Sequence, residues 1–519
     1  MQYDVIIVGG GSAGCALATR LSEDPTRSVL LLEAGPDYVD FEQWPTELRD
    51  GTSQEASNPG AVFNWSYQAV ATDRQPEPIQ IARGRVMGGS GAVNGQVFLR
   101  GLPEDYDSWA ARGNDQWAYG YVLPFFRKME SDADVQDDFH GSDGPVPVVR
   151  APRDAWHPFQ HAFLRACTDL GYPEDPDMNN PSSAGVGPAP MNNPAGIRMS
   201  CALAYLSSAR HRLNLTVRGN VLVRRVLFDG RAVVGVEAES GGEVFSVSGG
   251  EVVLCASGIA SPQLLMLSGV GPADHLAELG IATVQDLPGV GRNLRDHPLV
   301  YVDSVLHPDY APQEFDGSRI QTLLRYTTAG SETRNDMHVY VNNVASGPSP
   351  LGSGPGTDRP TLRMTCILQS ADSAGELRLA SADPHDKPLI DYCYLRSDWD
   401  RQRLREAVRL CRRILAQPSF RSIAGDPVSP TAEQIASDAA LDDWLLRNVF
   451  TTFHTSGSCR MGPSSDPMAV VDQYCRVHGV ENLRIVDLSI CPNVVRANTN
   501  ATAIMIGERA AAWIGSERL

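Results

Sequence analysis

The first forty residues contain the pattern that most restricts what this chain can fold into. An apolar run at 5–8 leads directly into a glycine-rich turn, in which Gly9, Gly11 and Gly14 have the spacing GxGxxG. A helical stripe of apolar residues follows, and a second apolar run ends at Glu33. This order predicts a βαβ unit of a parallel sheet, because such glycines let the backbone approach a pyrophosphate at the N-terminus of the helix.

Glu33 restricts the ligand that such a unit can hold. It lies 19 residues after Gly14, at the end of the second predicted strand, where a carboxylate accepts hydrogen bonds from ribose hydroxyls. A carboxylate at this place repels the additional phosphate of NADP, whereas NAD and FAD both remain possible. The alternative is a glycine turn that only links strand to helix. The complete order of strand, glycines, helix and acid favours dinucleotide binding.

Composition excludes several other classes of protein. The chain has 519 residues, enough for two to four domains, and its 42% of hydrophobic residues can build a large core. A net charge of −18 argues against a nucleic-acid partner, because nucleic-acid binding favours a basic surface. The ten cysteines include no CxxC pair, which indicates free thiols in a reducing compartment rather than disulfides or a metal site. With no leader pattern and no apolar run of about 18 residues, we expect a cytoplasmic protein without a transmembrane segment.

Three later segments extend the first pattern. Residues 83–94 form a second glycine cluster, whose backbone N–H groups can approach an anion or a flat ring, although an ordinary surface loop is the alternative. Residues 252–271 combine a buried strand, a helical stretch at 264–267 and a glycine stop. The last segment carries Phe453-His454-Thr455-Ser456-Gly457, then Asn498-Thr499-Asn500-Ala501 and a predicted helix at 502–514.

With these segments the sequence resembles the glucose–methanol–choline (GMC) family of FAD-dependent oxidoreductases, especially the branch of choline dehydrogenases and alcohol oxidases. The first family signature is followed from Gly84 to Asn94, with Met87 where another aliphatic residue is usual. The second is followed from Ser257 to Gly271, although Ser257-Gly258 stands where the family commonly has Gly-Ala. The resemblance covers essentially the whole chain and implies FAD as the cofactor.

The family resemblance also implies an α/β fold in two interleaved parts. A Rossmann-like FAD-binding domain would comprise residues 1–152, 196–298 and 451–519. A substrate-binding domain, built on an antiparallel sheet with helices, would comprise residues 153–195 and 299–450. The second region agrees with this organisation, because it shows strand-like and helical patterns and one loop rich in glycine and proline. The predicted strands are 302–306, 338–344, 362–368 and 377–379, the amphipathic helix is 401–417, and the flexible loop is 346–360.

By the same resemblance His454 is the active-site histidine. Oxidation of an alcohol by a flavin requires hydride departure from carbon and loss of the hydroxyl proton, and a neutral imidazole suits the proton step. Asn500 is assigned to the second position, where the family has His or Asn. Its amide can hold the alcohol oxygen but cannot titrate. The alternative is an amide bonded to the backbone of a turn, because Asn498 is only two residues away.

The residues predicted to hold FAD come from the glycine turn, the end of the second strand, the second glycine cluster and the C-terminal segment. They are Gly9, Gly11, Ser12, Ala13, Gly14, Glu33, Ala34, Arg85, Gly88, Ser90, Gly91, Asn94, Gly95, Val97, Val223, Ala256, Asp487, Asn498 and Thr499. The backbone of Val223 is matched to the adenine, and Asp487 to a hydrogen bond with the cofactor or, alternatively, to a helix cap. Val93 stands where some relatives attach FAD through a histidine, so non-covalent FAD is predicted.

The leading hypothesis is an FAD-dependent alcohol oxidoreductase that passes electrons to oxygen or another acceptor. The alternatives are a lyase or photodecarboxylase of the same fold, a choline-specific dehydrogenase, and a flavin-binding sensor without turnover. A primary alcohol, aromatic or furanic, is predicted in preference to choline, because a quaternary ammonium needs aromatic faces and a carboxylate. The candidate aromatic and acidic residues for an ammonium site are Tyr301, Tyr310, Phe315, Tyr326 and Tyr340, with Glu314 and Asp316. The sequence does not show that they come together, and Arg325 adds a cation to the same segment.

Overall fold

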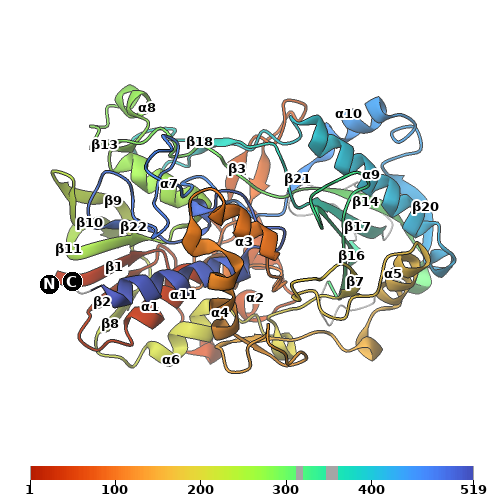
Figure 1. Ribbon diagram of the computed structural model, residues 1–519, viewed down its shortest axis with the longest axis horizontal. Helices are drawn as coiled ribbons and strands as arrows, with labels where there is room; N and C mark the ends of the chain where they lie inside the picture. Colours follow the sequence, from red (N-terminus) through yellow and green to blue (C-terminus); the bar gives the residue numbers. More distant parts are fainter. Residues whose placement is uncertain (1, 311–319, 346–360, 518–519) are drawn as a thin grey trace.

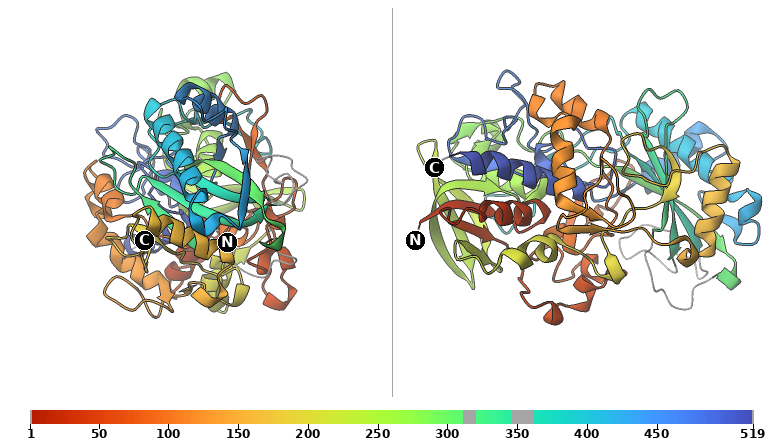
Figure 2. Two further views of the ribbon diagram at one scale, coloured as in Figure 1. Left: turned by 90° about the vertical axis from the view of Figure 1, so that its right-hand side faces the viewer. Right: turned by 60° about the horizontal axis from the view of Figure 1, so that its bottom comes forward.

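Two seven-stranded sheets lie at opposite ends of an elongated molecule (Figure 1). The computed structural model describes residues 2–310, 320–345 and 361–517. Both chain termini lie at the end formed by the first sheet (Figures 1 and 2). The fold is α/β, as predicted, with one largely parallel and one antiparallel sheet. The exact domain boundaries stay a prediction, and the proposed flexible loop at 346–360 lies outside the described residues.

The first sheet has the order β8-β2-β1-β11-β10-β9, with β22 paired to β11. Its strands are β1 (Gln2–Val8), β2 (Val29–Leu32), β8 (Leu215–Arg218), β9 (Leu222–Asp229), β10 (Ala232–Ser240), β11 (Glu243–Leu254) and β22 (Leu483–Ile485). The strands β8, β2, β1, β11 and β22 pair in parallel, and β10 and β9 continue the sheet in antiparallel. The last four residues of β1 and all of β2 are buried, which explains the uninterrupted apolar sequence of these two segments.

The predicted βαβ unit is confirmed, and its glycines have a steric reason. Helix α1 (Ser12–Leu21) begins within the glycine turn itself. Gly9 has a φ of +107°, a backbone conformation that side chains disfavour. A Cβ at Gly14 would collide with the carbonyl oxygen of Gly9, so the helix can lie this close to the strand only with glycine there. Helix α11 (Asn500–Ser516) packs beside α1, and Gly507 permits the close approach, because a Cβ there would stand 2.6 Å from the Ala13 oxygen.

The second sheet is antiparallel throughout, with the order β20-β14-β17-β16-β15-β7 and β21 paired to β14. Its strands are β7 (Gly185–Pro188), β14 (Pro298–Leu306), β15 (Thr322–Tyr326), β16 (Met337–Ala345), β17 (Thr361–Leu368), β20 (Ala424–Ser429) and β21 (Phe450–Thr451). The strands predicted at 302–306, 338–344 and 362–368 therefore exist, with slightly earlier starts. Helices α5 (Pro158–Asp169), α9 (Asp398–Leu415) and α10 (Asp438–Asn448) lie on the outer side (Figures 1 and 2).

The two faces of the second sheet differ in chemistry. The thiol of Cys366 on β17 lies 3.2 Å from that of Cys411 on α9, so residues in register with Cys366 face the outer helices. This face is apolar and includes Val300 and Val339, the residues paired with Cys366. Neighbouring residues along a strand point to the opposite face. That inner face carries His338, and it turns toward the rest of the molecule.

Shorter elements connect the two sheets. The helices are α2 (Thr46–Arg49), α3 (Pro103–Ala110), α4 (Tyr119–Met129), α6 (Ser207–Ala209) and α8 (Ala273–Glu278). The two-stranded sheets are β3 (Tyr67–Ala69) with β4 (Ile79–Ile81), β5 (Glu130–Asp132) with β6 (Val146–Val148), β12 (Val270–Gly271) with β13 (Gln285–Asp286), and β18 (Glu376–Arg378) with β19 (Leu389–Asp391). No helix among the described residues is both long enough and apolar enough to cross a membrane.

The helix predicted at 264–267 was placed too late and too short. Helix α7 runs over Ser257–Leu267, so that Pro262 lies inside it. Proline has no N–H, so the carbonyl of Gly258, four residues earlier, lacks its helical partner. The hydroxyl of Ser458 donates a hydrogen bond of 2.7 Å to that carbonyl. Ser458, from a distant segment, therefore supplies the hydrogen bond that Pro262 cannot give to the Gly258 carbonyl.

Candidate active site

A cavity of about 690 Å³ opens along the carboxyl ends of β1 and β2. Its volume is in the usual range for a ligand site. Eight of the residues predicted to hold the cofactor line it, namely Gly9, Gly11, Glu33, Ala34, Arg85, Ser90, Val223 and Ala256. The carboxyl ends of parallel strands are the expected place for a dinucleotide in such a sheet.

Glu33 is held in place by the backbone at the end of β2. Its Oε2 accepts a hydrogen bond of 2.9 Å from the Gly10 N–H, and its Oε1 accepts one of 2.9 Å from the Gly35 N–H. Burial raises the pKa of Glu33 to about 7, against the opposing effect of these N–H groups. Each oxygen retains a further lone pair, so the carboxylate can still accept a hydroxyl at the cavity wall.

The cavity wall also fits an anionic ligand. Above Gly11 the space is open, since a Cβ there would meet nothing nearer than the Gly89 Cα at 4.0 Å. The guanidinium of Arg85 stacks over Trp65 at 5.0 Å, and among the described residues neither Arg83 nor Arg85 forms an ion pair. Arginines that form no ion pair, beside an open glycine cradle, suit a pyrophosphate, as a dinucleotide requires.

The other predicted cofactor residues do not line this cavity, and their contacts with a cofactor stay a prediction. They are Ser12, Ala13, Gly14, Gly88, Gly91, Asn94, Gly95, Val97, Asp487, Asn498 and Thr499. Gly91 lies against the start of α1, because a Cβ there would stand 2.9 Å from the Ser12 Oγ.

Asp487 acts as a cap rather than as part of the cavity wall. Its carboxylate accepts hydrogen bonds from the Ser257 N–H (2.9 Å), the Ser261 hydroxyl (2.6 Å) and the Ser489 N–H (2.8 Å). These bonds hold the start of α7 to the C-terminal segment. They agree with the second of the two roles considered for Asp487, that of a helix cap. Burial raises the pKa of this carboxyl.

His454 lies in a cluster of three histidines, the His454 cluster, in which His297 and His338 are buried and His454 is partly exposed. Its Nδ1 is 2.8 Å from the Nδ1 of His297, and its backbone N–H donates to Asp296 at 2.8 Å. Burial, together with the neighbouring His297 and Arg83, holds the pKa of His454 well below its usual range. Its imidazole is therefore neutral at neutral pH.

The structure brings His454 together with Asn498, not with Asn500. The Asn498 Nδ2 lies 3.4 Å from the His454 Nε2. Asn500 is the first residue of α11, and its Oδ1 accepts a hydrogen bond of 2.7 Å from the Ser12 hydroxyl. The two asparagines are separated by the start of the helix, which sends their side chains to different partners. The amide beside His454 is therefore that of Asn498, and the role assigned to Asn500 in holding the alcohol stays a prediction.

Sequence reasoning missed the other two histidines. His297 appeared as part of a loop rich in turn residues, and His338 as part of a strand. Burial lowers the pKa of His297 to about 4, and that of His338 well below its usual range with further contributions from Arg325, His297 and His454. A histidine inside an apolar strand, as in Met337–Ala345, is the sequence signal that could have found His338.

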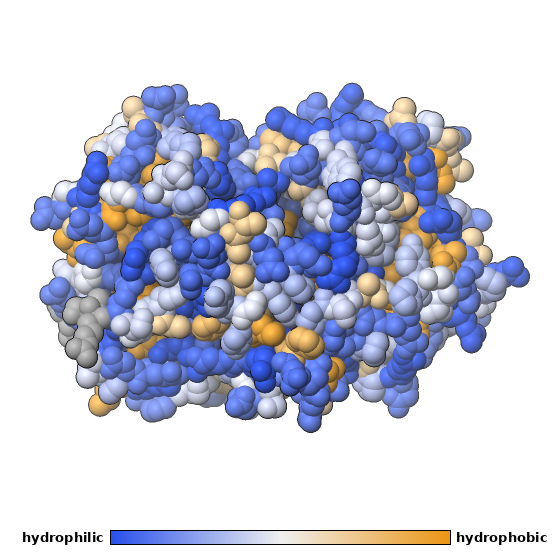
Figure 3. Space-filling view, viewed as in Figure 1, coloured by the Kyte–Doolittle hydropathy of each residue, from blue (hydrophilic) through white to orange (hydrophobic). Residues whose placement is uncertain are grey.

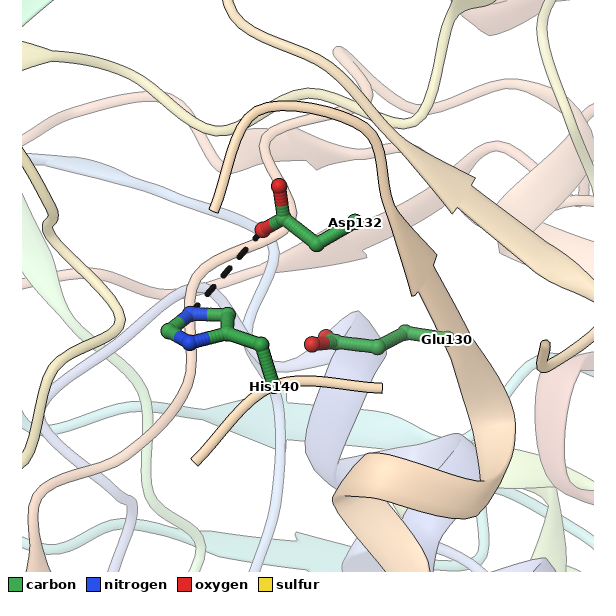
Figure 4. A group of neighbouring side chains, drawn as sticks. All are labelled: Glu130, Asp132 and His140. Atoms are coloured by element: carbon green, nitrogen blue, oxygen red, sulfur yellow. Dashed lines mark ion pairs between the residues drawn. The ribbon is translucent and has the colours of Figure 1, made fainter. Parts of the chain in front are cut away.

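A separate buried cluster of ionisable side chains lies at β5 (Figure 4). Ligand atoms of Glu130, Asp132 and His140 lie within 4.8 Å of one another. Arg100 contacts the Glu130 carboxylate, and Arg150 donates to both oxygens of Asp132 at 2.8 and 3.0 Å. Because these two guanidinium groups already neutralise the two carboxylates, the cluster is best explained as an ion-pair network that joins β5 to its neighbours.

The cavity and the His454 cluster are linked through Arg83. This residue lines the cavity, and its Nη1 donates a hydrogen bond of 2.6 Å to the carbonyl of Phe453, the residue before His454. A dinucleotide site beside a partly buried, neutral histidine is typical of a dinucleotide-dependent oxidoreductase. The patterns of the GMC oxidoreductase family match residues 3–299 and 371–507. The chain belongs to this family, and its cofactor is FAD.

Relatives of known sequence or structure agree with this assignment. The oxygen-dependent choline dehydrogenase of Photobacterium profundum is 37% identical over 98% of this chain and 92% of its own length. An uncharacterised GMC-type oxidoreductase of Rhodococcus erythropolis is 38% identical over 98% of this chain and 97% of its own. The crystal structure of pyridoxine 4-oxidase from Mesorbium loti has a TM-score of 0.91 and 31% identity, with 100% of both chains covered.

Proposed function

We propose that this oxidoreductase converts an alcohol to an aldehyde or ketone, with His454 as the base that takes the hydroxyl proton. The observation that carries the proposal is the pairing of a partly buried, neutral His454 with the amide of Asn498 and with His297. FAD, when bound, supplies the hydride acceptor. Oxygen or another acceptor then takes the electrons in a second half-reaction.

Donor and acceptor chemistry assigns the tautomer of His454. The Asn498 Nδ2 can only donate, so the His454 Nε2 facing it is the acceptor. The single N–H of the neutral ring is then on Nδ1 and donates to the His297 Nδ1. His297 consequently carries its proton on Nε2. The His454 lone pair is then on Nε2, where a substrate hydroxyl that takes the place of the Asn498 amide can deliver its proton.

The surroundings also favour proton loss from the substrate. The Asn498 amide can donate to the same oxygen atom that loses its proton, and the donor becomes more favourable as negative charge develops there. After proton uptake, the imidazolium of His454 is still stabilised by its bond to His297. His297 and His338 are buried, so the bond between His297 and His454 acts in a medium of lower dielectric constant than water.

The test is anaerobic reduction of the enzyme-bound flavin by simple alcohols, followed in a stopped-flow spectrophotometer. Bleaching of the flavin by a primary alcohol supports the proposal. Absence of bleaching by every alcohol, choline included, would contradict it and favour the lyase, photodecarboxylase or sensor alternatives. Bleaching by choline alone would favour a choline-specific dehydrogenase.

We further propose that FAD is held without a covalent bond. Val93, which is buried beside the second glycine cluster, has no nucleophilic atom. Acid precipitation of the purified protein is therefore expected to leave the yellow colour in the supernatant. Colour that stays with the pellet would contradict this.

A further inference from the structure

We propose that the substrate of this site is an alcohol that also carries an anionic oxygen, a carboxylate or a phenolate, and that Arg325 and His338 select for it. The inference rests on the proposed alcohol oxidation and adds the chemical class of the substrate. It is carried by an unpaired buried cation on the inner face of the second sheet.

Arg325 is a buried charge without a carboxylate partner. Its side chain is 1% exposed, and its Nη1 and Nη2 donate only to the backbone carbonyls of Met178 (2.6 Å) and Arg496 (2.9 Å). The Nε has no partner, and no ion pair joins Arg325 to any acid in the described part of the chain. Burial lowers the pKa of Arg325 to about 10, so the group is still charged at neutral pH. An unpaired buried charge is unfavourable until an anion compensates it.

Arg325 lies beside the His454 cluster. On adjacent strands it stands directly opposite His338, and opposite residues of an antiparallel pair share one face with Cβ atoms about 5 Å apart. The Nε2 of His338 is buried and has no partner. His338 in turn interacts electrostatically with His454 and His297. Two side chains with an unpartnered nitrogen therefore lie on the face that adjoins the proposed base.

The acids near the cluster are already engaged. Asp105 accepts hydrogen bonds from Arg496, at 2.6 Å from its Nε. Asp296 accepts from Tyr394 at 2.6 Å, from Thr451 and from the His454 N–H. Among the described residues no carboxylate forms an ion pair with Arg83 or Arg325, and Asp105 and Asp175 act on Arg325 only from a greater distance. A cationic substrate would be repelled here, whereas an anionic oxygen would complete the coordination of Arg325.

The aromatic residues of this face do not offer a free ammonium box. Tyr301 and Tyr340 are both in register with Thr365 and share its face. The guanidinium of Arg363 already lies over the Tyr301 ring at 4.3 Å, so a cation of the protein itself occupies that ring. The side chain of Tyr326 points to the other face of the sheet and packs against Tyr172. Phe315, Glu314 and Asp316, also candidates for such a box, lie outside the described residues.

The first experiment measures binding to the wild-type holoenzyme. Benzoate, benzamide and benzyltrimethylammonium have one ring and differ in charge, and each is titrated while the flavin absorbance is recorded. We expect benzoate to bind at least tenfold more tightly than benzamide, and the ammonium compound to bind most weakly. Equal or tighter binding of benzyltrimethylammonium would overturn the inference, and so would equal binding of benzoate and benzamide.

The second experiment tests Arg325 itself through kcat/KM for 4-(hydroxymethyl)benzoate and benzyl alcohol. Arg325→Met is expected to lower the ratio of the two values at least tenfold, and Arg325→Lys to keep most of it. Arg447→Met, on the exposed surface of α10, is the control for loss of an arginine and should leave the ratio unchanged. An unchanged ratio in Arg325→Met would overturn the inference. If Arg325→Met does not retain FAD, the result for Arg325→Lys and the wild-type binding series decide.

The two proposals fail in different ways. If no alcohol reduces the flavin, the proposed function fails, while the binding series still reports which charge the site prefers. If alcohols reduce the flavin but kcat/KM is independent of substrate charge, the proposed function holds and the assignment to Arg325 and His338 is wrong.

Discussion

The cofactor end and the catalytic end of this protein are built in different ways. At the cofactor end, one continuous stretch from Gly9 to Gly14 supplies the turn, the close approach and the helix start, and the chemistry depends mostly on backbone. At the catalytic end, His297, His338 and His454 come from three distant segments and meet only in the folded chain. Changes at the first end should therefore affect structure and FAD binding, and changes at the second should affect the reaction.

The largest expected effect is that of His454→Ala. Loss of a general base typically slows a reaction by about 10²–10⁴-fold, so flavin reduction should slow by this factor. FAD content should not change, because His454 does not line the FAD cavity. Stopped-flow reduction and the absorbance ratio of flavin to protein measure the two quantities. A reduction rate equal to that of the wild type would remove His454 from the mechanism.

The converse effect is expected at the glycine turn. Gly14→Ala places a methyl group against the Gly9 carbonyl, and overpacking of this kind destabilises by about 1–3 kcal/mol. Gly11→Ala points into open space, so it should leave the free energy of unfolding nearly unchanged and weaken only FAD binding. Urea unfolding and FAD titration of the apoproteins separate the two. Similar unfolding curves for both variants would show that the close approach at Gly14 is not needed.

The two asparagines give a matched test at the catalytic end. Asn498→Ala removes a donor beside the His454 Nε2, and loss of one such hydrogen bond should slow flavin reduction by about tenfold. Asn500→Ala removes the bond to Ser12 and should reduce stability by about 1 kcal/mol without a comparable change in rate. Reversed effects in the two variants would support Asn500, and not Asn498, as the residue that holds the alcohol.

The smallest expected effect is on the pH dependence of stability. His297 has a pKa of about 4 when folded and 6.5 when unfolded, so between these values only the unfolded state binds its proton. This contribution stabilises the protein above pH 6.5 and is lost as the pH falls toward 4. Glu33, with a pKa raised to about 7, acts in the opposite direction between pH 4.5 and 7.

The contribution of His297 is therefore measured as a difference. Denaturant midpoints of the wild type and His297→Gln between pH 4.5 and 7 share the effect of Glu33, which cancels in the comparison. The wild type should lose more stability than the variant as the pH falls. Parallel pH curves would show that the buried imidazole of His297 is protonated as easily as in the unfolded chain.

The surface of the molecule says less about function than the cofactor end or the catalytic end does. It is predominantly hydrophilic on the face shown in Figure 3, with a notch at the upper edge between the two lobes. This agrees with the acidic composition and identifies no partner. The cytoplasmic location and the electron acceptor remain predictions.

The sequence by itself determined the cofactor end. Strand, glycine spacing, helix and Glu33 all occur within about thirty residues, and local sterics alone require that order. His454 was assigned from the family resemblance, and the strands at 302–306, 338–344 and 362–368 from their apolar patterns. The three strand predictions are confirmed, because an apolar strand pattern depends on neighbours in the sequence, whereas the role of His454 stays a prediction.

Only the tertiary structure decided which side chains meet. Asn498 and Asn500 are equivalent in the sequence, and the start of α11 sends one to His454 and the other to Ser12. His338 and Arg325 become neighbours through the register of two antiparallel strands, which no local pattern states. The charge of these two side chains, and the lack of partners for their nitrogens, depend in turn on burial by residues far along the chain. Electrostatics in a protein interior is a property of the whole packing, so the chemistry of the catalytic end could not be read before the fold was known.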